Sequence, residues 1–362
     1  MKKTLLFIAT LLTSYLGMAQ ETYHPTAENL KAREQFQDEK FGIFLHWGLY
    51  SMMGTTEWIM TNRDINYKEY PKLAKTFYPS EFDADAWVKA IKAAGAKYIT
   101  ITTRHHDGFS LFKTATSSYN SVDGTPFKRD IIKEMADACQ RNGIKLHLYY
   151  SHLDWGREDY PVGRTGTGTG RPKEKADWAS YYKFMNTQLT ELLTNYGKVG
   201  AIWFDGWWDH DSDAKPFDWQ LEEQYALIHK LQPQCLIGNN HHHTPFPGED
   251  IQIFERDLPG ENKAGLSGQS IGRLPLESCQ TINEHWGYNI TDTLYKSPKE
   301  LIQMLVRAAG KNANLLLNIG PEPGGALPEL ALNRLQAIGE WLNKYGETIY
   351  GTRGGIVGPH EW

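Results

Sequence analysis

The sequence has few cysteines, no excess of basic residues and no long apolar run beyond its N-terminus. Its 362 residues include three cysteines, an odd number that implies no disulfide framework, so we expect Cys139, Cys235 and Cys279 to be buried free thiols. With 38 Lys and Arg against 43 Asp and Glu, the formal net charge is −5, which argues against a protein that binds the nucleic-acid backbone. No later segment is apolar for about 18 residues, so we expect no membrane span in the mature chain.

Residues 1–19 have the features of a secretory signal peptide. Two lysines precede an apolar run of 13 residues, at positions 4–16, which is too short to cross a bilayer comfortably. Gly17 and Ala19 are the small residues expected before a cleavage site, here after Ala19. We therefore expect an exported protein, periplasmic or secreted, whose mature chain begins at residue 20. An N-terminal membrane anchor is the alternative.

Strand-like and helix-like segments alternate along the chain, which predicts parallel strands with right-handed crossovers. About eight strands over roughly 300 residues indicate an α/β fold of the (β/α)8-like TIM-barrel type, and no G-x-G-x-x-G motif follows the first strand as a dinucleotide fold would require. We expect a single catalytic domain over residues 20–352 and a tail over 353–362. The expected strands are 41–45, 98–102, 144–150, 199–204, 235–237, 251–254 and 314–319; the expected helices are 86–94, 131–138, 181–193, 225–231, 298–309 and 329–345.

Polar residues follow the apolar runs closely. In such a barrel the carboxyl ends of the strands form one rim, where active sites are built, so we expect these residues to face a common pocket. A Gly- and Thr-rich stretch, 163–170, lacks the G-K-[ST] ending of a phosphate-binding loop and is expected to be a flexible surface loop. The polar groups expected at the rim are 46–47, 104–107, 149–152, 203–205, 239–241, 254–255 and 276–277.

Two kinds of hydrolysis fit a rim of carboxylates, imidazoles and indoles, because the chain has no G-x-S-x-G elbow and the strand order suggests no Cys–His pair. Metal-assisted hydrolysis is disfavoured. The first strand ends in one histidine, His46, and adjacent histidines such as His105 and His106 alternate sides on a strand. The run of three histidines at 241–243 is expected in an exposed loop. We therefore expect no metal and no cofactor.

Glycoside cleavage by two carboxylates is favoured. Asp205 ends an apolar run and precedes a glycine turn, so it is a short, stiffly held carboxylate that suits a nucleophile. Glu255 ends a later strand, where burial is expected to raise its pKa as a general acid requires, while strand alternation should turn Arg256 outward. Two other residues are rival candidates for the acid. Glu277 is also expected at the end of a strand, and Glu57 is expected in a loop after the first strand.

These residues resemble the α-L-fucosidases of glycoside hydrolase family 29. The resemblance runs from about residue 25 to 352, and its motifs are long and occur in the family's order. The matching stretches are FGIFLHWG at 41–48, EW at 57–58, RHHDGF at 104–109, YYS at 149–151, LDW at 153–155, IWFDG at 202–206, WGY at 286–288 and NLLLNIGP at 314–321.

The resemblance implies a retaining exo-hydrolase on a (β/α)8-like barrel. It places the nucleophile at Asp205 and the acid/base at Glu255, although the position of the acid/base varies across the family. It places the aromatic residue near the C6 methyl group at Trp286. Independently of the resemblance, the side chains of Trp58, Phe109 and Trp286 are expected to supply apolar surface for the sugar ring and its methyl group. The residues implied to bind fucose are His46, Glu57, Trp58, His105, His106, Tyr149, Trp203 and Trp286.

The chain departs from the family pattern in three places. The family's Asn-Asn-Arg reads Asn239-Asn240-His241, so an arginine that would contact the sugar is replaced by a shorter histidine. We expect no C-terminal β-sandwich domain, which many members carry, and the stretch 163–170 looks like an insertion on the leaving-group side of the rim.

The sequence therefore predicts a retaining exo-α-L-fucosidase that acts on fucosylated glycans, with no nucleic-acid partner. Two alternatives remain: an α-L-galactosidase or related exo-glycosidase on the same barrel, and a non-catalytic fucose-binding relative. The presence of Asp205 disfavours the second alternative.

Overall fold

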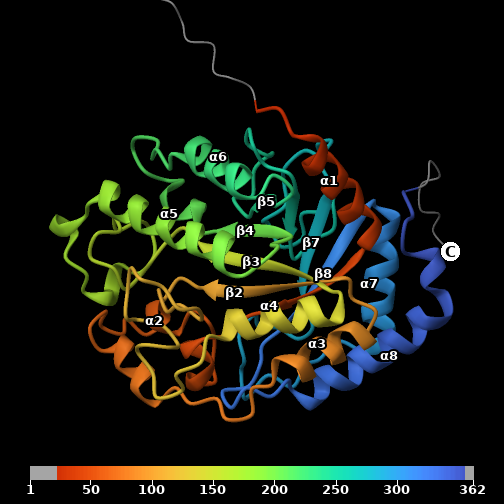
Figure 1. The fold of residues 1–362 in the computed structure, drawn as a ribbon, viewed down its shortest axis with the longest axis horizontal. Helices are drawn as coiled ribbons and strands as arrows, with labels where there is room; N and C mark the ends of the chain where they lie inside the picture. The colour runs from red at the N-terminus through yellow and green to blue at the C-terminus, as the bar shows by residue number, and fades with distance from the viewer. Residues whose placement is uncertain (1–22, 355–362) are drawn as a thin grey trace, which may run out of the picture.

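The structure, a computed structural model, describes residues 23–354. The predicted signal peptide lies outside the described residues, as does the predicted tail from residue 355 onward. Eight parallel strands form the barrel that the sequence predicts (Figure 1). They are β1 (Phe41–Leu45), β2 (Tyr98–Arg104), β3 (Lys145–Ser151), β4 (Ala201–Asp205), β5 (Leu236–Asn239), β6 (Gln252–Glu255), β7 (Leu276–Thr281) and β8 (Ala313–Ile319).

Adjacent strands pair in the order β5-β4-β3-β2-β1-β8-β7-β6. The seam between β5 and β6 is joined by a single parallel bridge, Gly238 to Ile251, and by the Ile251 backbone N–H, which donates to the Ile237 carbonyl at 3.1 Å. The described chain has no helix between β5 and β6, or between β6 and β7. Long loops, residues 240–251 and 256–275, replace these helices.

The helices surround the strands, and several of them begin at a side-chain cap. Asp83, Asp130 and Asp177 each accept a backbone N–H from the first turn of the helix that follows, and Ser297 forms a capping box with Glu300. The α-helices are α1 (Ala27–Glu39), α2 (Ile59–Asn62), α3 (Ala84–Ala93), α4 (Ile131–Asn142), α5 (Trp178–Asn195), α6 (Leu221–Leu231), α7 (Pro298–Gly310) and α8 (Glu329–Tyr345).

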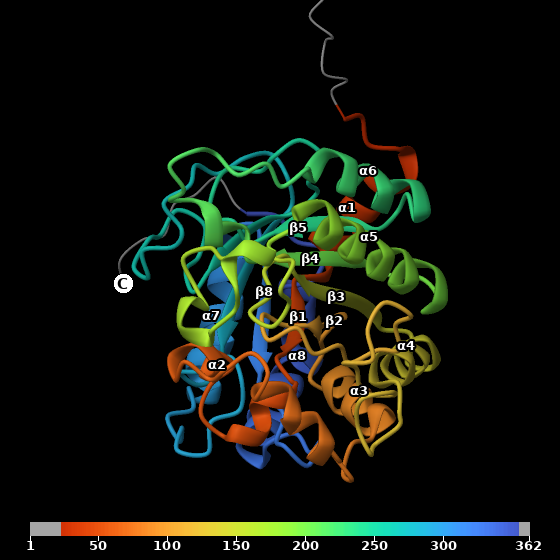
Figure 2. The ribbon, with the colours of Figure 1, turned by 90° about the vertical axis from the view of Figure 1, so that its left-hand side faces the viewer.

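Helix α1, which the sequence did not predict, lies at the amino end of the barrel. Its Phe36 is buried and packs against Tyr98 and His147, near the starts of β2 and β3, with ring centroids 5.4 and 6.0 Å apart. The Phe36 carbonyl also accepts a hydrogen bond from Asn314 Nδ2. This end of the barrel is thus covered, and the opposite end, which faces the viewer in Figure 2, carries the functional rim.

Two expectations about buried groups have different outcomes. All three cysteines are free and buried, as predicted. Glu277, however, does not end a strand: it is the second residue of β7, which begins at Leu276 and continues to Thr281. Its carboxylate lies inside the barrel and accepts hydrogen bonds from Tyr98 Oη at 2.7 Å and Trp203 Nε1 at 2.8 Å. The prediction that Glu277 lies at the rim is therefore wrong.

Burial raises the pKa of Glu277 to about 7, which leads to a stability prediction. A pKa raised above the unfolded value of 4.5 means that the wild type loses stability as the pH rises from that value through 7. A difference of this size corresponds to about 3 kcal/mol. We expect the unfolding free energy of Glu277→Gln, relative to wild type, to grow by about that amount between roughly pH 4 and 8, measured by urea denaturation. A pH-independent difference would contradict this burial-driven shift.

The glycine-rich stretch is closely packed, although we expected a flexible surface loop. Thr169 is buried, the Gly166 N–H donates to Thr61 Oγ1 at 3.0 Å, and a Cβ on Gly168 would lie 1.7 Å from Asp64 Oδ1. The glycines therefore allow the loop to lie close against its neighbours.

Among the helices of residues 23–354, none combines the length and apolar character needed to span a bilayer.

Candidate active site

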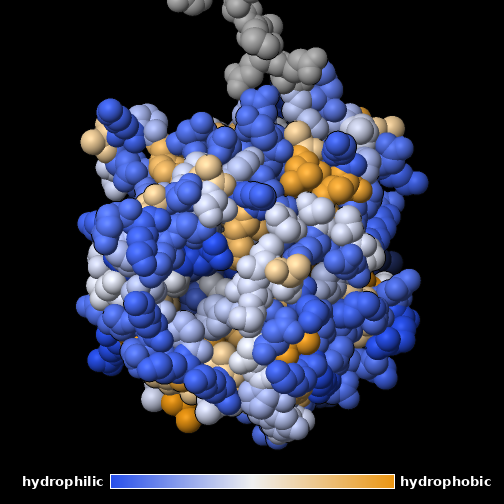
Figure 3. All heavy atoms as spheres, turned by 60° about the vertical axis from the view of Figure 1, so that its left-hand side comes forward, coloured by the Kyte–Doolittle hydropathy of each residue, from blue (hydrophilic) through white to orange (hydrophobic). Residues whose placement is uncertain are grey.

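A pocket of about 210 Å³ opens among the carboxyl ends of the strands. The surface on this side is largely hydrophilic and is hollowed near its centre (Figure 3). The pocket is smaller than the roughly 300–1,000 Å³ of sites for drug-sized ligands, so it suits one sugar ring. It is lined by Phe44, His46, Glu57, Trp58, His105, His106, Arg164, Trp203, Asp205, Trp208, Asn240, His242, Glu255, Leu266, Cys279 and Trp286.

Asp205 is the last residue of β4 and is held from two sides. Its Oδ1 accepts hydrogen bonds from the Gly206 N–H at 2.8 Å and from Trp208 Nε1 at 3.0 Å, while Oδ2 accepts one from Tyr149 Oη at 3.0 Å. Gly206 has a φ of 93°, a conformation that favours glycine and turns the chain sharply away from the carboxylate. Burial and the charge of nearby Glu255 raise the pKa of Asp205 to about 6.

Glu255 is the last residue of β6 and faces the same pocket. Its Oε2 lies 2.8 Å from Asn240 Nδ2, which donates to it, and 2.9 Å from His242 Nε2. Burial acts to raise the pKa of Glu255, but the contacts with His242 and Asn240 outweigh it and leave the pKa below its usual value. The expectation of a raised pKa was therefore wrong, because it counted burial and not the partners.

The side chain of Asn240 connects the two carboxylates. Its Nδ2 is 3.4 Å from Asp205 Oδ1 and 2.8 Å from Glu255 Oε2. Asp205 Oδ1 and Glu255 Oε2 are therefore separated by at most the sum of these distances, about 6 Å, so both carboxylates lie within reach of one glycosidic bond.

Two pocket histidines have tautomers fixed by their partners. Ser151 Oγ donates to the Leu153 carbonyl at 2.6 Å, so it accepts from His106 Nδ1 at 2.7 Å. Asn318 Nδ2 donates to the Trp286 carbonyl, so its Oδ1 accepts from His46 Nδ1 at 2.6 Å. Burial lowers the pKa of both imidazoles, to about 4 for His46. The neutral His46 ring therefore has an Nε2 that can accept a hydrogen bond from a ligand hydroxyl, whereas His106 Nε2 lies 3.5 Å from Asp205 Oδ2.

Aromatic rings form the floor of the pocket. Tyr149 stacks between His105, at 5.5 Å, and Trp203, at 5.6 Å, and its hydroxyl reaches Asp205 from below. His105 Nδ1 is buried without a protein partner, and burial lowers the pKa of this histidine well below its usual value. This floor places flat apolar faces beside directional polar atoms, a combination suited to a sugar.

The loop that follows β1 supplies Glu57 and Trp58. Glu57 Oε2 accepts the Gly287 N–H at 2.9 Å, which joins this loop to the one that carries Trp286. Trp58 stacks on Trp208 with ring centroids 5.6 Å apart. Arg256, which we expected to turn outward, is exposed, and its guanidinium lies 5.2 Å from the centroid of the Trp286 ring.

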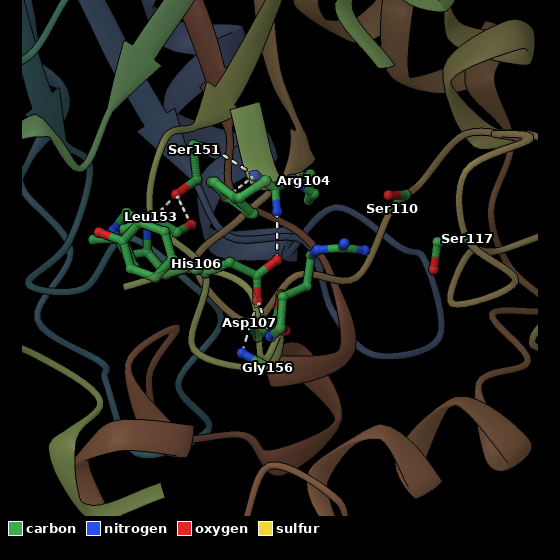
Figure 4. A network of polar contacts seen from close by, with 12 residues as sticks. Arg104, His106, Asp107, Ser110, Ser117, Ser151, Leu153 and Gly156 are labelled. Carbon is green, nitrogen blue, oxygen red and sulfur yellow. Dashed lines mark hydrogen bonds and ion pairs between the residues drawn. The ribbon is translucent and has the colours of Figure 1, made fainter. Parts of the chain in front are cut away.

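Behind the pocket, a buried ion pair supports His106. Arg104 pairs with Asp154 at 2.5 Å and donates to the Ser151 carbonyl at 2.6 Å, and Ser151 in turn holds His106 (Figure 4). Arg104 lies on the predicted rim segment 104–107, yet its guanidinium points away from the pocket. It positions the site from behind and does not line it.

The structure thus brings the predicted site residues together. Nine of them line the pocket, and the tenth, Tyr149, donates a hydrogen bond from its hydroxyl to Asp205 Oδ2. The expectation for Phe109 was wrong, because it is buried against Phe77 and Tyr119 outside the pocket. Within residues 23–354, no three or more His, Cys, Asp and Glu side chains are grouped as a metal site requires.

Sequence reasoning missed Trp208, Arg164 and His242. A short 3-10 turn, Trp207–His210, follows Gly206 and directs Trp208, the second residue of the turn, to the carboxylate of Asp205. Arg164 comes from the glycine-rich stretch, and its guanidinium lies 5.2 Å from the Trp208 ring centroid. No local pattern reveals these directions.

The three histidines at 241–243 do not form one exposed loop, as we had expected. His241 is buried and its Nε2 lies 3.0 Å from Glu249 Oε1, so it faces away from the pocket. His242 lines the pocket, while His243 is exposed beside Trp207. His241, which replaces the family's arginine, therefore does not reach the sugar site, whereas the next residue, His242, does.

Comparisons with known proteins agree with this site. The alpha-L-fucosidase family model matches residues 10–347. The plasma alpha-L-fucosidase of Rattus norvegicus is 31% identical over 96% of this chain and 78% of its own length, and that of Homo sapiens is 30% identical over 91% and 72%.

Solved structures give the same result. Alpha-L-fucosidase isoenzyme 1 from Paenibacillus thiaminolyticus superposes with a TM-score of 0.82 at 37% identity, covering 92% of this chain and 80% of that one. Alpha-L-fucosidase AlfC from Lactobacillus casei, in complex with its alpha-L-fucose product, has a TM-score of 0.76 at 28% identity, covering 88% and 99%. With a family match over nearly its whole length and a pocket built around paired carboxylates, the chain belongs to the alpha-L-fucosidase family of glycoside hydrolases.

Proposed function

We propose that this enzyme is a retaining exo-α-L-fucosidase that removes terminal L-fucose from fucosylated glycans by double displacement. In the first step Asp205 attacks the anomeric carbon, the bond to the leaving oxygen breaks, and Glu255 gives that oxygen its proton. In the second step water attacks the same carbon, Glu255 takes a proton from the water, and the bond to Asp205 breaks to release fucose.

The carrying observation is the position of Asn240 between the two carboxylates. An amide that hydrogen-bonds to both carboxylates places Asp205 and Glu255 at one pocket, close enough to act on the same glycosidic bond as nucleophile and acid. The test is NMR of the anomer formed first from an aryl α-L-fucoside. Initial α-fucose agrees with the proposal, and initial β-fucose would refute it.

The polar atoms of the pocket fit the hydroxyl groups of fucose. His46 offers a hydrogen-bond acceptor at its Nε2, so a ligand must present a hydroxyl donor to it. A sugar with a misplaced hydroxyl would leave such a group unpaired, which discriminates between epimers. Trp286 supplies apolar surface for the C6 methyl group. Comparing aryl α-L-fucoside with aryl α-L-galactoside, which carries a hydroxyl at C6, tests this assignment against the galactosidase alternative.

The raised pKa of Asp205 predicts the acid side of the pH profile. Asp205 must be ionised to attack, so kcat/KM on an aryl fucoside should fall as the pH drops below about 6. Tyr149→Phe removes a hydrogen bond that lowers the pKa of Asp205, so this limb should move to higher pH. The control is Tyr150→Phe, because the Tyr150 hydroxyl donates to Gln188 outside the pocket. Equal profiles for both variants would argue against Asp205 as the titrating group.

We also propose that the enzyme is exported and that residues 1–19 are removed. The support is the charged start, short apolar run and small residues of that segment. Mass spectrometry of the enzyme from its natural host should find Gln20 at the N-terminus in the periplasmic or secreted fraction. An intact Met1 on cytoplasmic enzyme would contradict the proposal.

A further inference from the structure

The contact between His242 and Glu255 has no role in the mechanism described above. His242 Nε2 lies 2.9 Å from Glu255 Oε2, and the two side chains are 19% and 15% exposed. The second hydrogen-bond partner of Glu255 Oε2 is Asn240, whose amide group does not take up or release a proton at the pH values where enzymes work. His242 is therefore the one titratable group in the described chain that hydrogen-bonds to Glu255.

The loop after β5 is built to present His242 in this position. His241 is fixed by Glu249, which also accepts from Tyr225 Oη at 2.9 Å, and the His243 N–H donates to His241 Nδ1 at 3.0 Å. Between these anchors His242 adopts a φ of 66°, which is uncommon for a residue other than glycine. A strained backbone fixed on both sides points to a function for the side chain it directs.

The chemistry of Glu255 creates a need for such a partner. As acid, Glu255 must carry a proton when the glycoside arrives, yet its contacts keep its pKa low in the free enzyme. An imidazole holds a proton to higher pH than a carboxylate, with ordinary values of about 6.5 and 4.3. A proton kept on the imidazole would therefore remain available at pH values where Glu255 alone would have lost it.

We propose that His242 holds the proton that Glu255 delivers to the leaving group and takes it back after each turnover. The proton passes from His242 Nε2 to the Glu255 carboxylate, and from there to the glycosidic oxygen as its bond to the anomeric carbon breaks. In the second step water gives a proton to Glu255, which returns it to His242, so no proton is gained or lost beyond hydrolysis itself. His242 acts through Glu255 and is a positioning residue. This inference rests on the proposed role of Glu255.

Other charged groups around the pair set the field in which it titrates. They come from several elements: Asp205 and His46 across the pocket, Glu57 after β1, Arg164 from the glycine-rich stretch, Arg256 next to Glu255, Cys279 on β7, and His241 and His243 in the same loop. The His242 variants described below leave all of these groups in place, and the control variant changes only His243.

The test is the alkaline limb of kcat/KM on a fucosyl disaccharide, whose leaving group needs an acid. His242→Gln keeps a donor near Glu255 but holds no proton, so this limb should move to lower pH by about one unit or more. His242→Asn should do the same, and asparagine tolerates the left-handed backbone well, so it provides a second variant if the first fails to fold. His243→Gln is the matched control and should leave the limb in place.

The outcomes separate this inference from the proposed function. A limb that moves in both His242 variants and stays in place in His243→Gln supports proton storage. A uniform loss of rate with an unchanged limb would mean that His242 only orients Glu255, and it would overturn the inference. If the loss of rate in Glu255→Gln does not depend on the leaving group, that result contradicts the proposed role of Glu255 as the acid, and with it the role of His242.

Discussion

Asp205→Asn is expected to remain folded and to lose hydrolysis almost completely. The amide oxygen can still accept from Gly206 and Trp208, while the amide nitrogen can donate to the Tyr149 hydroxyl, so the contacts of the side chain survive. An amide cannot form the glycosyl ester, and loss of a nucleophile costs roughly 10⁴–10⁶ in kcat. The measurement is kcat on an aryl fucoside, with circular dichroism to confirm the fold. A variant that keeps more than about a tenth of the wild-type rate, a barrier change of only about 1.4 kcal/mol, would contradict the assignment.

A small nucleophile should restore part of this activity with a diagnostic product. In Asp205→Gly the missing carboxylate leaves space on the face from which it attacked, and azide can enter there. A single displacement by azide would give β-fucosyl azide from an α-fucoside. Recovery of the α-azide instead would place the nucleophile elsewhere.

Glu255→Gln is expected to separate substrates by their leaving groups. General acid catalysis contributes roughly 10²–10⁴ in rate and matters most when the leaving oxygen is a poor one. Hydrolysis of fucosyl disaccharides should therefore fall by about that factor, while formation of the fucosyl-enzyme from a nitrophenyl fucoside should fall far less. Azide, which needs no base, should then react with the fucosyl-enzyme and give α-fucosyl azide, the product of two inversions.

The same experiment on Glu277→Gln and Glu57→Gln tests the rival acids. Glu277 lies inside the barrel and contacts Tyr98 and Trp203 only, so its variant should show neither dependence on the leaving group nor rescue by azide. Glu57 is fixed by the Gly287 N–H, and its variant should raise KM for both kinds of substrate. The pattern assigned to Glu255 appearing in either of these variants would move the acid to that residue.

The barrel and most of its rim could be predicted from the sequence because buried parallel strands are nearly continuous apolar runs, and the residues that follow them meet at one end. Asp205 and Glu255 were identified in this way. Glu277 was misplaced because a leucine before a carboxylate was taken as the end of a strand, whereas Leu276 begins β7. Helix α1 was missed since it buries only Asn29 and Phe36 and has little apolar pattern.

What the sequence could not supply is the direction of side chains beyond the strand ends. Trp208 reaches Asp205 and Trp207 does not, because a 3-10 turn replaces the alternation of a strand. Likewise His242 faces the pocket because His241 is bound to Glu249, a contact set by the tertiary structure. The pKa of Glu255 depended on these partners, so burial alone gave the wrong direction.

The most direct test of the central claim is to trap the covalent intermediate. A 2-deoxy-2-fluoro-fucosyl fluoride has a good leaving group and a destabilised transition state for the second step, so the fucosyl-enzyme should accumulate. Proteolysis and mass spectrometry should then find the fluorosugar on the peptide that contains Asp205, and Asp205→Asn should carry no label. Label on a different carboxylate, or no label while the wild type still hydrolyses aryl fucoside, would contradict double displacement through Asp205.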